Sequence, residues 1–139
     1  MRLTSPFVMT IFGATGDLTQ RKLLPALFHL YAKRELPEKF YIIGFSRRAY
    51  SAEEFKSFLW EGLVSHTGTT EPDINVWREF SGKIFYQKGD FDKESGYRAL
   101  IETLAGFDKE LRACVPRYFY LATPPQNYSS ILTYLHQTK

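Results

Sequence analysis

The chain has 139 residues, 44% of them hydrophobic and 24% charged, and a formal net charge of +3. This is the length and balance of one globular domain, and the charge is too small to indicate a nucleic-acid partner. The single cysteine, Cys114, excludes an intrachain disulfide and a thiolate metal cluster, and we expect it to be a small buried side chain. The histidines are scattered without metal-ligand spacing, so no metal site is predicted.

No stretch is long and apolar enough to cross a membrane, and the first residues lack the pattern of a signal peptide. We therefore expect a cytoplasmic protein with no membrane partner.

Strand-like and helix-like segments alternate from the start of the chain. Phe7–Phe12 is a short apolar run ended by a glycine, which is typical of a buried strand. Leu18–Lys33 has helical spacing, although Pro25 requires the helix to start just before it or to kink there. Phe40–Phe45 is predicted to be the second strand.

The same alternation continues in the second half. Ser51–His66 begins with a serine followed three residues later by Glu54, a capping box that predicts a helix start. The polar segment 67–80 is either an irregular loop or a short added helix. The remaining predicted elements are strands at Lys83–Lys88 and Arg117–Ala122 and helices at Lys93–Phe107 and Pro125–Gln137.

The resulting order, β-α-β-α-β-α-β-α, predicts an α/β fold. It indicates a Rossmann-like, doubly wound, mostly parallel sheet flanked by helices and cut short after four strands. We treat residues 1–139 as one domain, and the fourth strand as a possible open edge of the sheet.

Gly13 and Gly16 lie where the first strand meets the first helix. In a doubly wound sheet this turn lies at the carboxyl edge, where glycine lets the backbone approach an anion and the helix start attracts it. The spacing Gly13-x-x-Gly16-x-x-Thr19 is not G-x-G-x-x-G, and Leu18 stands where a P-loop has its second glycine. On these residues alone, an ordinary strand-to-helix turn is an equal alternative.

The end of the second strand favours the phosphate interpretation. An NAD-binding domain carries an acid there for the ribose 2′-hydroxyl, whereas this strand runs into Arg47 and Arg48. Guanidinium groups suit a 2′-phosphate through bidentate charge-assisted bonds. The alternative is a solvated basic turn, which we rank well behind phosphate binding.

Other residues are predicted to lie near the same edge. Lys22 follows the glycine turn and could project back toward it, and Asp17 could cap the helix or hold the loop. Thr123 and Pro124 end the fourth strand with a rigid wall, and Tyr128 follows at the start of the last helix. Core packing is the alternative role for Tyr128.

Three stretches of the chain resemble the N-terminal coenzyme domain of the glucose-6-phosphate dehydrogenase family. They are GATGDLTQRKLLPALFHLY, IIGFSRR and FYLATPPQNY, in order and at fitting spacing, and the resemblance covers essentially the whole chain. The run G-A-S/T-G-D-L-x-x-K/R-K is rather specific to that family. Thr19 and Gln20 replace the commoner Ala and Lys of the pattern.

The resemblance implies an NADP site and assigns roles to its residues. Thr15 and Arg47 would contact the 2′-phosphate with help from Arg48, and Lys22 would sit at the junction of coenzyme and sugar phosphate as the one catalytic candidate. The pyrophosphate turn would comprise Gly13, Ala14, Thr15, Gly16, Asp17, Leu18, Thr19 and Gln20, and the nicotinamide end would lie beside Thr123, Pro124 and Tyr128.

The family oxidises glucose 6-phosphate at carbon 1 to 6-phosphogluconolactone, passing hydride to NADP, and so opens the oxidative pentose phosphate pathway. Full-length members are homo-oligomers. The E-K-P strand and the R-I-D-H-Y-L-G-K stretch, whose lysine and histidine serve the substrate, do not occur in this sequence. We therefore expect the catalytic C-terminal domain to be absent, and the chain alone to be inactive and a monomer or weak dimer.

Two other functions are alternatives to this interpretation. A stand-alone, non-catalytic NADP-binding sensor or regulatory module is the alternative that stays open. A short-chain reductase is rejected, because none of Tyr50, Tyr97, Tyr118 and Tyr128 begins the Tyr-x-x-x-Lys pair that such an enzyme needs.

Overall fold

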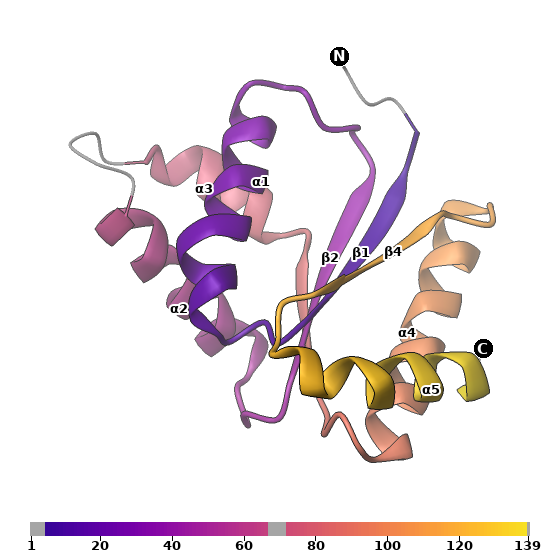
Figure 1. Cartoon of the computed structure of the whole chain (residues 1–139). Helices are drawn as coiled ribbons and strands as arrows, with labels where there is room; N and C mark the ends of the chain where they lie inside the picture. The colour runs from indigo at the N-terminus through magenta and orange to yellow at the C-terminus, as the bar shows by residue number, and fades with distance from the viewer. Residues whose placement is uncertain (1–4, 67–71, 139) are drawn as a thin grey trace.

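Four parallel strands form a single sheet in the order β3-β2-β1-β4 (Figure 1). The structure is a computed structural model that describes residues 5–66 and 72–138. The strands are β1 (Phe7–Phe12), β2 (Phe40–Ser46), β3 (Ile84–Lys88) and β4 (Arg117–Leu121). The order reverses between β1 and β4, which makes the carboxyl ends of these two strands a topological switch point where ligands bind in such sheets. The predicted doubly wound parallel sheet is confirmed.

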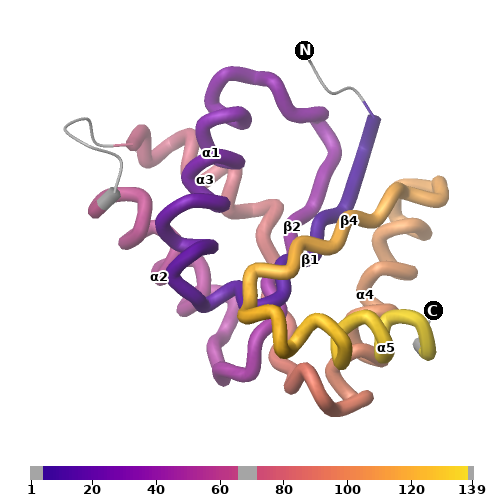
Figure 2. Tube along the Cα trace, in the orientation of Figure 1, coloured from indigo at the N-terminus to yellow at the C-terminus, as the bar shows by residue number. Residues whose placement is uncertain are grey.

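Helices cover both faces of the sheet, as Figures 1 and 2 show. One face packs against the first three α-helices, and the other against the last two. The helical elements are η1, a π-helical turn (Thr19–Leu23), α1 (Leu24–Ala32), α2 (Ala52–His66), α3 (Ile74–Ser81), α4 (Glu94–Leu111), η2, a 3₁₀ turn (Pro125–Asn127), and α5 (Tyr128–Thr138).

The central strand β1 is buried on both faces because its side chains alternate between two apolar clusters. Phe7 and Ile11 pack with the helices α1 to α3, whereas Val8 and Phe12 pack with α4 and α5. Each such buried side chain contributes roughly 1.5–3 kcal/mol of hydrophobic stabilisation. This two-sided core holds the carboxyl edge, where the strands end, in a fixed place.

Pro25 divides the predicted helix Leu18–Lys33 into two parts. The amide of Leu24 bonds to the carbonyl of Thr19, five residues back, so the turn before the proline is wider than an α-helical turn. Proline lacks an N–H and its ring clashes with the carbonyl four residues earlier in a regular helix. The α-helix therefore starts at Leu24, immediately before Pro25, as the sequence allowed.

The capping box at the start of α2 is confirmed. Ser51 N–H donates to Glu54 Oε1 at 2.9 Å, and Glu54 N–H donates to Ser51 Oγ at 3.1 Å. Of the two alternatives for the segment 67–80, the short added helix is correct, and this helix is α3. Asp73 caps α3 by accepting a hydrogen bond from Asn75 N–H at 2.8 Å. Residues 67–71 of that segment lie outside the described residues.

Two predictions about the second half need correction. The helix predicted at Lys93–Phe107 is too short, since α4 continues to Leu111 rather than ending at Phe107. Cys114 is exposed, not buried, because it lies in the turn between α4 and β4 rather than in either element. Among the described residues no helix is long and apolar enough to cross a membrane, and no cluster of side chains could hold a metal ion.

Candidate coenzyme-binding site

The turn after β1 depends on glycine at position 13. Gly13 has a φ of +85°, and a Cβ added there would overlap the carbonyl oxygen of Ala122 at the end of β4. Its N–H donates to the carbonyl of Phe45 in β2 at 2.9 Å. The turn is therefore pressed between the ends of β2 and β4, in a conformation that side chains rarely adopt.

The start of the following helix leaves amide groups for an anion. Gly16 N–H donates to the carbonyl of Gly13 at 3.0 Å, and the first bond of the helical ladder runs from Gln20 N–H to Gly16 at 3.3 Å. The N–H groups of residues 17–19 come before this first bond, so the helix itself offers them no carbonyl acceptor. Groups of this kind, with the helix dipole, bind phosphate.

A cavity of about 560 Å³ opens at the carboxyl edge of the sheet, in front of this turn. Such a volume is within the range of small-molecule sites. The ends of all four strands contribute to its lining, which consists of Gly13, Thr15, Gly16, Ser46, Arg47, Gly89, Asp90, Phe91, Asp92, Ala122, Thr123, Pro124, Asn127 and Ser130.

Six of the predicted coenzyme-binding residues line this cavity: Gly13, Thr15, Gly16, Arg47, Thr123 and Pro124. The segment after β3 was missed, although its sequence, GDFD, directly follows a predicted strand. In a parallel sheet every strand ends at the same edge, so this position alone was a usable signal. Asp90 and Asp92 add two acidic residues to the lining that contains Arg47.

Tyr97, a buried residue of α4, holds the turn after β3 in place. This tyrosine is fully buried, its hydroxyl donates to the carbonyl of Phe91 at 2.8 Å, and burial raises the pKa of the phenol. Gly89 and Gly96 allow close packing there, since a Cβ on Gly89 would overlap the ring of Phe45. The part of the cavity wall that this turn forms is thus fixed by its contacts with the core.

The side chains of several predicted residues in the glycine turn serve the fold instead of lining the cavity. Ala14 is fully buried, and Thr19 is fully buried with its hydroxyl donating to the carbonyl of Gly13 at 3.3 Å. The amide of the Gln20 side chain donates to the carbonyl of Phe58 in α2 at 2.9 Å. These three side chains do not line the cavity, so a contact from this part of the turn to phosphate would come from its backbone.

The remaining predicted residues also lie outside the lining. Asp17 pairs with Arg21 at 3.3 Å rather than capping the helix, and Leu18 is exposed. Lys22 is exposed on η1. Tyr128 is also exposed, which rules out the core-packing alternative, and it is the neighbouring Asn127 that lines the cavity.

The two arginines after β2 occupy different positions. Arg47 lines the cavity, whereas Arg48 directs its guanidinium to Tyr50, donating to the hydroxyl at 3.2 Å and lying 5.9 Å from the ring centroid. At the base of this turn the hydroxyls of Thr15 and Ser46 are 2.9 Å apart. Of the two arginines, Arg47 is therefore the one that lines the cavity together with the glycine turn.

The segment after β4 forms a rigid wall, as predicted. Asn127 donates through its side-chain amide to Thr123 Oγ1 at 2.6 Å and through its backbone to the carbonyl of Pro124 at 3.0 Å. These bonds fold the segment into η2 and fix the Thr123 hydroxyl against the cavity.

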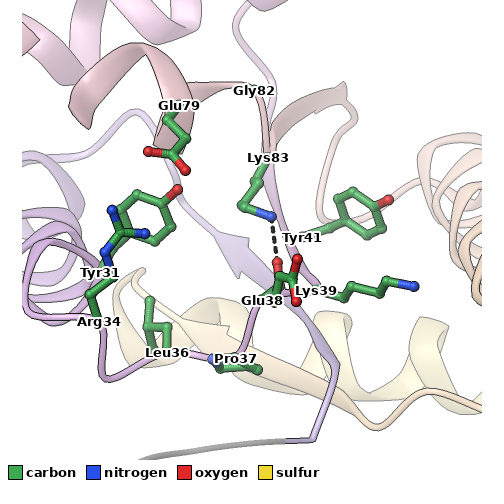
Figure 3. Close-up of a pocket in the computed structure, with 10 residues that line it drawn as sticks. All are labelled: Tyr31, Arg34, Leu36, Pro37, Glu38, Lys39, Tyr41, Glu79, Gly82 and Lys83. Atoms are coloured by element: carbon green, nitrogen blue, oxygen red, sulfur yellow. Dashed lines mark hydrogen bonds between the residues drawn. The ribbon is translucent and has the colours of Figure 1, made fainter. Parts of the chain in front are cut away.

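A second cavity, of about 850 Å³, lies at the opposite, amino edge of the sheet (Figure 3). It is bounded by the carboxyl ends of α1 and α3, which carry negative partial charge and disfavour phosphate. Glu79 bonds to Tyr31 there, and burial together with this carboxylate raises the pKa of the tyrosine to about 12. Arg34, Lys39 and Lys83 also line this cavity, but the cavity that places a cation beside the start of a helix and a glycine turn is the smaller one, at the carboxyl edge.

Comparison with known proteins agrees with this geometry. A family model described as "Glucose-6-phosphate dehydrogenase, NAD binding domain" matches residues 10–139. Glucose-6-phosphate 1-dehydrogenase from Chlamydia pneumoniae is 41% identical over 99% of this chain and 27% of its own length. The Streptococcus pneumoniae protein of the same name is 35% identical over 96% of this chain and 26% of its own length.

Among solved structures, a glucose-6-phosphate dehydrogenase in complex with glucose 6-phosphate superposes with a TM-score of 0.87 and 32% identity, over 99% of this chain and 28% of the solved one. The chain thus spans about a quarter of the length of these relatives. Its sheet order, its glycine turn at the switch point and the family match over residues 10–139 agree, and the chain belongs to the glucose-6-phosphate dehydrogenase family, as its N-terminal domain that binds a nicotinamide coenzyme.

Proposed function

We propose that the chain is the NADP-binding domain of a glucose-6-phosphate 1-dehydrogenase. The observation that carries the proposal is that the Gly13–Gly16 turn and Arg47 line one cavity at the carboxyl edge of the sheet. An acid that would repel a 2′-phosphate does not occur at the end of β2, where Ser46 is the last residue of the strand and Arg47 and Arg48 follow it.

Each part of the cavity has a role in coenzyme binding. The amides at the start of η1 and the close approach allowed by Gly16 suit the pyrophosphate, and Arg47 with the Thr15 hydroxyl suits the 2′-phosphate. Thr123 and Pro124 form the wall for the nicotinamide end. The bound coenzyme would supply the hydride acceptor, while the residues of this chain bind and orient it.

The sugar chemistry is proposed for the parent protein. Relatives are named glucose-6-phosphate 1-dehydrogenase, and one solved relative holds glucose 6-phosphate. Oxidation of that sugar to the lactone, the entry to the pentose phosphate pathway, needs a general base positioned at the sugar hydroxyl. None of the residues that line the cavity is a histidine, so we expect no turnover by the 139-residue chain alone.

The test is a calorimetric titration of the chain with NADP and with NAD. We expect tighter binding of NADP, and we expect Arg47→Ala to weaken it by about one to two decades while leaving NAD binding nearly unchanged. Arg48→Ala is the matched control, because it removes the same charge from a side chain outside the cavity lining. Equal affinities for both coenzymes, or equal losses in both variants, would contradict the proposal.

A further inference from the structure

Tyr86 of β3 reaches across to the turn that carries the arginines. Its hydroxyl oxygen lies 2.6 Å from the carbonyl oxygen of Arg48, 3.0 Å from Ser46 Oγ and 3.3 Å from the Ser46 carbonyl. In the parallel register Tyr86 is opposite Gly44, so its side chain extends along β2 toward the end of that strand. Tyr86 itself does not line the cavity.

A phenol has one proton, and the shortest of these contacts is to a carbonyl that can only accept. The proton is therefore assigned to the bond from Tyr86 to the Arg48 carbonyl. Ser46 Oγ accepts from Arg48 N–H at 3.2 Å and lies 2.9 Å from the Thr15 hydroxyl. Both backbone groups of Arg48 are thus held, and the network leads back to the glycine turn.

The ring of Tyr86 is also held, by packing against other aromatic rings. It packs on Phe55 of α2 with ring centroids 4.8 Å apart and on Tyr50 at 6.0 Å. The absence of a side chain on Gly44 makes room for this packing, since a Cβ there would overlap the Phe55 ring. Burial raises the pKa of the Tyr86 phenol above its ordinary value.

These hydrogen bonds hold Ser46 and Arg48, the residues on either side of Arg47. Arg47 itself lines the cavity. The inference rests on the proposed binding of NADP. We propose that Tyr86 is a positioning residue for the 2′-phosphate: by holding the turn 46–48, it orients Arg47 and so sets the preference for NADP over NAD. It acts through the turn and does not touch the coenzyme.

The variant Tyr86→Phe tests this, because it removes the hydroxyl and keeps the packed ring. We expect NADP affinity to fall by about three- to tenfold and NAD affinity to stay the same, with the melting temperature little changed. Tyr41→Phe is the matched control, because it removes the hydroxyl that donates to Glu110 at 3.0 Å from a tyrosine outside the coenzyme cavity. That control should bind both coenzymes like the unmodified chain.

The outcomes separate this inference from the proposed function. An unmodified chain with no preference for NADP contradicts the proposed function itself. An unmodified chain that prefers NADP, with a Tyr86→Phe variant that keeps the same preference or weakens both coenzymes alike, overturns the role of Tyr86 only. Should Tyr86→Phe unfold at the assay temperature, both titrations are repeated at a lower temperature at which its melting curve shows it to be folded. An unchanged preference for NADP there overturns the inference, because the bond from Tyr86 to the Arg48 carbonyl is then absent from a folded chain.

Discussion

At the scale of single residues, the two glycines of the turn have different roles. Gly13 has the positive φ and no room for a side chain, whereas a Cβ on Gly16 would lie 3.2 Å from the Gly13 carbonyl oxygen, which is tight but not an overlap. Gly13 is therefore needed for the fold of the turn itself. Gly16 is needed only if a ligand approaches its backbone.

Gly13→Ala should destabilise the chain by about 2 kcal/mol or more, because it adds the cost of a left-handed alanine to the clash with Ala122. Gly106→Ala is the control, since Gly106 lies within α4 with open space around it and should gain roughly 0.5–1 kcal/mol. Urea unfolding of the two variants measures both changes. A Gly13→Ala chain as stable as the unmodified one would show that the turn relaxes without cost.

The site residues that could be predicted from the sequence are those that come directly after a strand. Arg47 and Thr123 were predicted because each comes directly after a strand, and both line the cavity. The side chain of Gln20 could not be assigned in this way, because its partner, the carbonyl of Phe58, lies across the fold in α2. Sequence spacing along η1 does not show which neighbouring helix covers it.

At the scale of elements, the helix ends were the least predictable feature. The helices α1 and α4 both end with an arginine in the left-handed conformation, Arg34 with φ of 61° and Arg112 with φ of 55°. Paired bonds close each end, such as Ala113 N–H to Asp108 and Arg112 N–H to Lys109. This is the Schellman arrangement, in which glycine is usual. Without a glycine, the sequence carried no stop signal for α4.

Asp108 joins the end of α4 to the start of β4. Its carboxylate accepts from Val115 N–H at 2.9 Å and from Arg117 at 2.8 Å, and these contacts, the Val115 bond foremost, hold the pKa of Asp108 below its usual value. Asp108→Ala should lower the free energy of unfolding by about 1–3 kcal/mol at pH 7. Asp108→Asn should lose less, because its side-chain oxygen can still accept from Val115.

The pH dependence of this effect has a definite sign. A carboxyl whose pKa is lower in the folded state stabilises the fold above its unfolded value of 3.8, and this contribution disappears as the pH falls through the folded value. The difference between the unmodified chain and Asp108→Ala should therefore be full at pH 5 to 7 and shrink below pH 3.8. Unfolding curves across that range check this, and a constant difference would contradict it.

At the scale of the whole molecule, the parallel sheet was predictable because all its strands are apolar runs separated by helical segments. The fourth strand was expected as an open edge, whereas the order of the strands in the sheet and the exposed aromatic residues of β4 required the structure. β4 is at one edge of the sheet, and its aromatic residues Tyr118, Phe119 and Tyr120 are exposed.

The backbone of β4 has one paired and one open side. Val8 N–H bonds to Pro116 and Ala122 N–H bonds to Phe12, so the even-numbered residues of the strand pair with β1. The odd-numbered residues 117, 119 and 121 therefore turn their N–H and C=O groups to the open edge. Such an edge is a template for pairing with another strand.

We therefore expect the chain to self-associate through β4 as its concentration rises. Tyr118→Lys should reduce this association, because a lysine on an edge strand must lose its hydration when a second strand pairs there. Leu132→Lys on α5 is the matched control, since it adds the same charge at a side chain of similar exposure, 57% against 54% for Tyr118. Sedimentation velocity at increasing concentrations measures the association. We expect the mass of the unmodified chain and of Leu132→Lys to rise together while Tyr118→Lys stays monomeric; equal behaviour of the two lysine variants would place the contact elsewhere.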